Sequence, residues 1–250
     1  MFRFVFYIII GLKIILSSEI FIQKVFMPWG QRMNELYEFL TGPALWAAFT
    51  IFIVGLIVRI VYLFALSKEK DRVLHNHASL KWACRSILQW LIPFGGMGFR
   101  SEPVFATASF VFHLCLLAVP LFLLAHNMLW DETFGVSLPA LPDFLADLLT
   151  MLFMVSAMIL LARRIIRADV RLLSTAWDYY FLVLTSTPFI TGFFAYHQIG
   201  PYKLTLNLHI IFAEVLLATV PFTRLGHIAL FFFSRAFIGC EMGRRRTRTW

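Results

Sequence analysis

The stretch of sequence that decides the fold runs from Pro103 to Trp130 and reads PVFATASFVFHLCLLAVPLFLLAHNMLW, without a single Asp, Glu, Lys or Arg. A helix needs about 20 apolar residues to cross the hydrocarbon core of a bilayer, so this stretch is long enough to span a membrane. Of the 250 residues, 60% are hydrophobic and only 14% are charged, which is too apolar for a domain with a hydrated surface. The sequence therefore predicts an all-α integral membrane protein.

Apolar segments of similar length recur along the chain, and we expect a helical bundle with five core transmembrane helices. They are predicted at Pro43–Leu66, Pro103–Trp130, Phe144–Ala162, Trp177–Tyr196 and Leu204–Phe233. Three alternatives stay open for the apolar N-terminal segment, residues 1–36: a sixth span, a helix at the membrane surface, or an extension upstream of a start at Met27 or Met33. The membrane domain is assigned to residues 37–235 and a basic tail to residues 236–250.

The basic residues predict the orientation of the bundle, because Lys and Arg are retained on the cytoplasmic side. They are concentrated in Ser67–Glu102, in Arg163–Ala176 and in the C-terminal tail. The loop Asp131–Asp143 has none, and the loop His197–Lys203 has one. The core is therefore expected to begin outside and to end in the cytoplasm. This asymmetry accounts for the net charge of +8, and we expect no nucleic-acid partner. The amphipathic stretch Leu80–Leu91 predicts a helix on the cytoplasmic membrane surface.

Four histidines lie inside predicted spans, where an ionisable side chain is costly and needs a reason to be present. His113 and His126 lie in the second span, and His209 and His227 lie in the fifth. Because these two helices run in opposite directions, His113 is level with His227 in the inner half of the membrane, and His126 with His209 in the outer half. Two level pairs indicate two haems, one near each surface. In the alternative, the histidines form hydrogen bonds within a haem-free bundle.

The angular positions of these histidines require a distortion of the second span. The interval from His209 to His227 is a whole number of helical turns, whereas the interval from His113 to His126 leaves the two side chains about 140° apart on an ideal helix. Pro120 lies between His113 and His126. Since proline removes a hydrogen bond and displaces the preceding turn, we expect a bend there.

Two strings of sequence resemble known membrane cytochromes. The string LHIIFAEVLLATVPFTRLGH (Leu208–His227) resembles the last helix of the nitrate reductase gamma-subunit family. The string Arg100–Trp130 is more similar to the membrane cytochromes b of sulfate-reducer electron-transfer complexes. The resemblance covers about Tyr37 to Arg235. The nitrate reductase gamma subunit has a shorter interval between its histidines in the second helix, which argues against a nitrate reductase partner.

The resemblance implies a dihaem b-type cytochrome subunit in a bacterial cytoplasmic membrane, with menaquinol or menaquinone as its substrate. It also implies a cytoplasmic iron–sulfur subunit as a partner and, in some complexes, a periplasmic multihaem cytochrome c. The sequence contains no nucleotide, molybdenum or iron–sulfur motif, so we expect an electron-transfer subunit without a complete terminal active site. The alternatives are a cytochrome b anchor of a formate dehydrogenase or hydrogenase, and a haem-free transporter or scaffold.

Four further residues invite a role in the site. Arg224 lies three residues before His227, where a haem propionate would be a suitable partner; snorkelling to the inner headgroups is the alternative. On the outer side, Trp130, His197 and Lys203 form a candidate quinone site, because a quinol must release protons as well as electrons. An aromatic belt with a snorkelling lysine is the alternative there.

Overall fold

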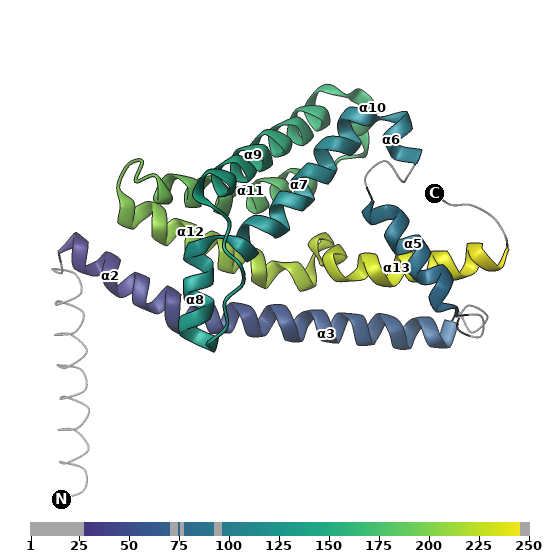
Figure 1. Cartoon of the computed structure of the whole chain (residues 1–250), viewed down its shortest axis with the longest axis horizontal. Helices are drawn as coiled ribbons and strands as arrows, with labels where there is room; N and C mark the ends of the chain where they lie inside the picture. The colour runs from purple at the N-terminus through teal and green to yellow at the C-terminus, as the bar shows by residue number, and fades with distance from the viewer. Residues whose placement is uncertain (1–27, 71–74, 76–77, 93–96, 246–250) are drawn as a thin grey trace, which may run out of the picture.

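A computed structural model describes residues 28–70, 75, 78–92 and 97–245 of the chain (Figure 1). Over these residues the secondary structure is helical and contains no strand. Five segments are long and apolar enough to cross a membrane: Trp29–Lys70, Pro103–Phe122, Asp143–Ile166, Tyr202–Phe222 and Arg224–Gly243. The predicted all-α membrane bundle is confirmed. The expectations for residues 1–27 and for the end of the basic tail lie outside the described residues.

The first membrane segment is longer than the predicted Pro43–Leu66. Helix α2 (Trp29–Phe39) continues through a π-helical turn, η1 (Leu40–Ala44), into α3 (Leu45–Lys70). Pro43 lies inside the π-helical turn, whose wider hydrogen-bonding pattern accommodates a residue without an N–H group. Along α3 many large apolar side chains are exposed, as a helix that faces lipid requires.

The second predicted span is interrupted. Helix α7 (Pro103–Phe122) contains Pro120, and Leu123 adopts an extended conformation (φ −70°, ψ 132°) before α8 (Leu124–Phe134) begins. Figure 1 shows α8 running across the direction of α7. The prediction of one continuous helix over Pro103–Trp130 is therefore wrong after Phe122. The distortion expected near Pro120 occurs as a break: α7 ends at Phe122, two residues after the proline. Proline favours such a break because it has no N–H to donate and its ring clashes with the preceding turn.

The fifth predicted span is also two helices, so the single helix Leu204–Phe233 is wrong. The segments in order are α12 (Tyr202–Thr219), η2 (Val220–Phe222), η3 (Arg224–Gly226) and α13 (His227–Arg244). Thr223 separates the two short 3₁₀ turns in an extended conformation (φ −122°, ψ −175°). Pro221 in η2 lacks the N–H that would continue the helix. Figure 1 shows α13 extending beyond the end of α12 toward the opposite end of the molecule.

The third and fourth predicted spans form as expected. The helices are α9 (Asp143–Ile166), α10 (Ala168–Leu173) and α11 (Ala176–Tyr196). Helix α11 has 21 residues and packs against both α9 and α12, but it is not among the five segments that qualify as membrane spans by length and composition. The hydroxyl groups of Thr185, Ser186 and Thr187 donate to carbonyl oxygens four residues earlier at 2.7–2.8 Å. These bonds satisfy the three hydroxyl groups, which could find no hydrogen-bond partner in lipid.

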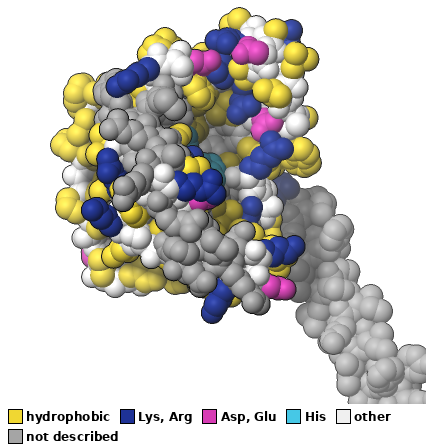
Figure 2. Space-filling view, turned by 90° about the vertical axis from the view of Figure 1, so that its right-hand side faces the viewer, with side chains coloured by type: hydrophobic (Ala, Val, Ile, Leu, Met, Phe, Trp, Pro, Cys, Tyr) yellow, Lys and Arg dark blue, Asp and Glu magenta, His cyan; other side chains and the backbone are white. Residues whose placement is uncertain are grey.

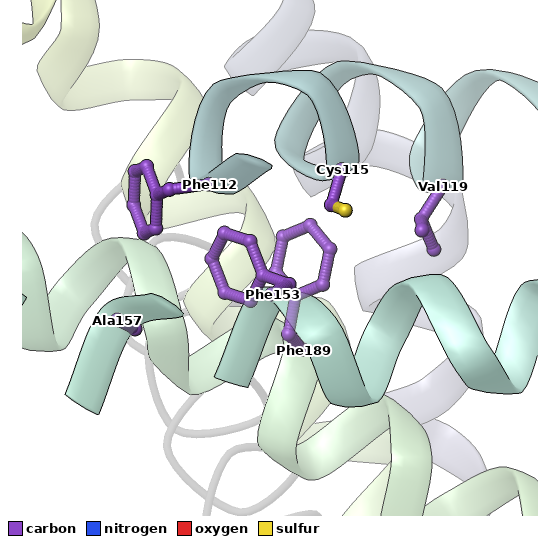
Figure 3. Packing of buried hydrophobic residues seen from close by; sticks show 6 residues of the cluster. All are labelled: Phe112, Cys115, Val119, Phe153, Ala157 and Phe189. Carbon is purple, nitrogen blue, oxygen red and sulfur yellow. The ribbon is translucent and has the colours of Figure 1, made fainter. Parts of the chain in front are cut away.

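The best-buried apolar side chains lie where α7, α9 and α11 meet (Figure 3). Phe153 is fully buried and stacks on Phe112 and on Phe189, with ring centroids 4.6 Å and 3.8 Å apart. Cys115 of α7 adjoins this stack. Because lipid tails are as apolar as these side chains, close van der Waals contact is what holds such a cluster together in a membrane. The cluster fixes the rotation of α7, and so the position of His113 beside Phe112.

Helix α5 (Leu80–Leu91) forms over the residues predicted for a surface helix and packs against α13. Gly239 and Gly243 permit this contact, since a Cβ atom at these positions would collide with Ser86 and Trp82. Leu80, Leu88 and Leu91 of α5 are exposed. This is the geometry of a helix with one face on the bundle and another available to lipid.

Figure 2 shows the end of the molecule that lies to the right in Figure 1, with Lys and Arg side chains spread over it. Helices α5 and α10, which belong to two of the basic segments, lie toward this end, as does the end of α13. The described parts of the segments predicted to be cytoplasmic thus lie toward one side of the molecule. The membrane side on which they lie stays a prediction.

Candidate functional site

The four histidines of the predicted site lie in two pairs. His113 of α7 and His227 of α13 have ring centroids 5.9 Å apart, and we call them the inner pair. His126 of α8 and His209 of α12 have ring centroids 6.0 Å apart, and we call them the outer pair. The partners are those expected from the sequence, but two broken helices bring them together where continuous helices were predicted.

Each histidine has its Nδ1 atom within hydrogen-bonding distance of a backbone carbonyl oxygen. The distances are 2.7 Å for His113 to Ser109, 3.0 Å for His126 to Pro120, 2.8 Å for His209 to Pro188, and 2.9 Å for His227 to Arg224. A carbonyl can only accept, so Nδ1–H is the donor and Nε2 of the neutral ring keeps its lone pair. Histidines that bind a metal through Nε2 are oriented in this way.

The spacing of the rings also suits a metal ion between two Nε2 atoms. A metal–imidazole bond is about 2 Å long and the ring centre lies about 1 Å behind the nitrogen, so two ligating rings are separated by roughly 6 Å. The observed separations of 5.9 Å and 6.0 Å agree with this value. Within the described residues, no three His, Cys, Asp or Glu side chains cluster as ligands. A pair of imidazoles is a ligand set that haem iron can take from a protein, because haem brings its other ligands with it.

Two prolines and one glycine build the outer pair. The break after α7 frees the carbonyl of Pro120, and His126 in the first turn of α8 donates to it. The carbonyl of Pro188 on α11 holds His209. Gly192 is one turn further along α11, and a Cβ atom there would lie 2.8 Å from Nδ1 of His209. The imidazole can approach α11 only because residue 192 has no side chain.

The inner pair is more exposed than the outer pair and has a different ring geometry. His113 bonds to the carbonyl of the preceding turn of its own helix, whereas His227 bonds to Arg224 at the break before α13. The two inner rings are inclined by 78°, but the two outer rings by only 15°. Phe112 packs edge-on against His113, with centroids 5.4 Å apart.

The side chain of Arg224 is directed to a protein carboxylate. Its Nη1 donates to Oδ1 of Asp178 at 2.7 Å, and Asp178 also caps the start of α11 in a capping box with Thr175. The backbone carbonyl of Arg224 is the group that contacts the inner pair, through His227. Arg224 therefore lies beside the predicted inner site, with its guanidinium already in an ion pair.

The three residues of the candidate quinone site have separate partners. His197 at the end of α11 contacts Asp147 of α9, with Nε2 and Oδ1 3.1 Å apart. Lys203 donates to Asn34 of α2 at 2.8 Å. Trp130 of α8 packs against aromatic rings of α3 and α8. Among the described contacts none joins two of these three residues directly, and their place in one site stays a prediction.

Arg59 is the residue near the site that the sequence analysis missed. It lies within α3, and its Nη1 donates to the carbonyl oxygens of Pro221 at 2.7 Å and of Thr223 at 2.6 Å. The available signal was a lone arginine in the middle of an apolar span, since intramembrane charges mark functional positions. Gly192 carried no signal in the sequence, because its role depends on the approach of another helix.

Comparison with known proteins gives one relative and no structural match. No family model matches the chain, and no solved structure matches it. A protein of Nitratidesulfovibrio vulgaris is 43% identical over 215 residues, which cover 84% of this chain and 95% of the relative. That relative is named only "Protein", so its name assigns no activity. With this identity over nearly the full length of the relative, the chain belongs to the same family as the N. vulgaris protein.

Proposed function

We propose that the chain is the dihaem b-type cytochrome subunit of a respiratory complex, with one haem b at each histidine pair. It moves electrons across the membrane between menaquinol, menaquinone or a periplasmic cytochrome c and a cytoplasmic iron–sulfur partner. The observation that carries the proposal is the common geometry of the four histidines: every Nδ1 bonds to a carbonyl, and the paired rings are 5.9 Å and 6.0 Å apart. The resemblance to the nitrate reductase gamma-subunit family and to sulfate-reducer cytochromes b supports the same function.

The residues of the chain would supply placement and tuning. Haem, when bound, provides reversible one-electron chemistry. The imidazoles would hold it from both faces, and the carbonyl on each Nδ1 orients the ring and makes Nε2 a better donor. Pro120 and Pro188 provide two of those carbonyls, and the core around Phe153 keeps α7 in register with the histidines of the other helices.

The same hydrogen bonds weigh against a proton relay in a haem-free transporter or scaffold. A histidine that passes protons must gain a proton at one ring nitrogen and release it at the other. In all four histidines the Nδ1–H is committed to a carbonyl oxygen, which cannot donate a proton in return. Fixed rings of this kind are better suited to hold a ligand than to transfer protons.

For the quinol we propose a site on the outer side, near His126 and His209. His197 is the most suitable proton acceptor of the three candidates, because a ring that donates Nε2–H to Oδ1 of Asp147 keeps a lone pair on Nδ1 that can take a proton. Lys203 and Trp130 would border the site, with the amide of Asn34 keeping Lys203 on the α2 side. Release of protons outside and transfer of electrons inward would conserve energy across the membrane.

The experiment that tests the proposal is haem counting in His209→Ala. Loss of His209 leaves His126 as the single axial ligand of the outer site, so a pyridine haemochrome assay should show about half of the wild-type haem per chain. His75→Ala is the matched control: His75 packs between Phe64 and Phe237 outside the two pairs, and its loss should leave the haem content unchanged. Full haem content in His209→Ala would contradict the assigned pairing.

A further inference from the structure

Arg59 reaches from α3 into the break between α12 and α13. In a continuous helix the N–H of Leu225 would bond to the carbonyl of Pro221, but here it is directed to the hydroxyl oxygen of Thr223 at 3.3 Å. The carbonyl of Pro221 accepts from Arg59 instead. The carbonyl of Thr223 accepts from both Arg59 and the N–H of Gly226.

Two glycines allow α3 to lie against this break. A Cβ atom on Gly55 would be 2.6 Å from Cβ of Pro221, and one on Gly226 would be 2.5 Å from Nη1 of Arg59. Gly226 immediately precedes His227, so the guanidinium lies next to the backbone that carries one ligand of the inner pair. The guanidinium of Arg59 and the proposed ligand His227 therefore both adjoin the backbone at Gly226.

The hydrogen bonds from Arg59 to the α12–α13 break satisfy polar groups on both sides that would otherwise be unpaired in the membrane. A backbone carbonyl without a partner is costly inside a membrane, and so is an arginine without one. The break that aims His227 at His113 creates the first cost, and Arg59 creates the second. Hydrogen bonds from a single Nη1 atom to two carbonyls remove both.

We infer that Arg59 is the positioning residue of the inner haem site, an inference that rests on the proposed function. By holding the α12–α13 break it fixes His227, whose Nδ1 bonds to Arg224 and whose ring faces His113. Its fixed positive charge also favours the ferrous over the ferric state of a haem held there. Arg59 therefore raises the midpoint potential of the inner site and leaves the outer site unaffected.

The test is a redox titration of the complete chain in membranes, combined with haem counting and electron paramagnetic resonance (EPR). Arg59→Met should lower the midpoint potential of the inner haem, change its low-spin signal and reduce its content, while the outer haem keeps its potential. Arg59→Lys, which retains a charge and donors, should recover most of the potential. Arg235→Met is the control, because Arg235 stacks on Trp90 away from the break and its loss should change neither potential.

An inner haem with wild-type content, potential and signal in Arg59→Met would overturn the inference. If Arg59→Met does not accumulate in the membrane, Gly226→Ala is the second variant to test. The new Cβ atom at residue 226 should displace the guanidinium of Arg59, while the protein keeps the positive charge. A disturbed inner haem in Gly226→Ala supports the positioning role, and an undisturbed one overturns it. Failure of the proposed function is distinguishable, since the wild-type chain would then show no b-type haem spectrum at all.

Discussion

Replacing Gly192 with alanine should weaken the outer haem site selectively. The new Cβ atom would lie 2.8 Å from Nδ1 and 3.0 Å from Cε1 of His209, whereas ordinary van der Waals contact begins at 3.4 Å. The imidazole would have to withdraw by about 0.6 Å, the difference between 3.4 Å and 2.8 Å. That movement stretches the bond from Nδ1 to the carbonyl of Pro188, which is 2.8 Å long in the wild-type protein.

The magnitude follows from the cost of overpacking a close contact. Such substitutions cost about 1–3 kcal/mol, and each 1.4 kcal/mol is a tenfold change in an equilibrium constant, so haem should bind the outer site roughly 5- to 150-fold more weakly. Part of the cost would fall on folding of the bundle. The selective part is measured by haem content and by a redox titration that resolves the two haems.

A matched glycine provides the control. Gly30 is also helical, but a Cβ atom added there would have no other heavy atom within 4 Å, so Gly30→Ala should leave both haems unchanged. The expected result is a loss of the outer haem in Gly192→Ala and none in Gly30→Ala. Wild-type haem content and an unshifted outer potential in Gly192→Ala would refute the reasoning that residue 192 makes room for a ligand.

Three other outcomes are expected. EPR of the oxidised protein should resolve two low-spin species, the inner more anisotropic, because its rings are inclined by 78° and the outer rings by 15°; one species would contradict the assigned geometry. His197→Ala should slow haem reduction by a menaquinol analogue by up to about 100-fold without loss of haem; normal rates there and in Lys203→Ala would place the quinone near the inner pair. With native cysteines replaced, a membrane-impermeant reagent added outside should label Ser137→Cys but not Arg167→Cys, and the reverse pattern would invert the topology.

The sequence was sufficient to predict the class of fold because lipid imposes a simple constraint. A stretch such as Pro103–Trp130 has few options other than a buried or lipid-facing helix. Its break after Phe122 could not be predicted, since a proline inside a helix can bend it or end it. Which of these occurs depends on whether the freed carbonyls find partners, and here His126 provides one for Pro120.

The candidate site was predictable in its pairing and not in its detail. The direction of the helices was enough to match His113 with His227 and His126 with His209. The ring orientations depend on carbonyls from other parts of the chain, such as that of Pro188, which lies 21 positions before His209. Such contacts become visible only when the helices are packed, as does the reach of Arg59 to the α12–α13 break.

The most direct test of the central claim is the haem content of the purified wild-type chain, measured as a reduced-minus-oxidised spectrum together with a pyridine haemochrome assay. Two histidine pairs with the observed ring spacings predict b-type bands and two haems per chain. A protein that folds in the membrane and shows no b-type band, after expression with ample haem, would contradict the account and leave the four histidines to another role.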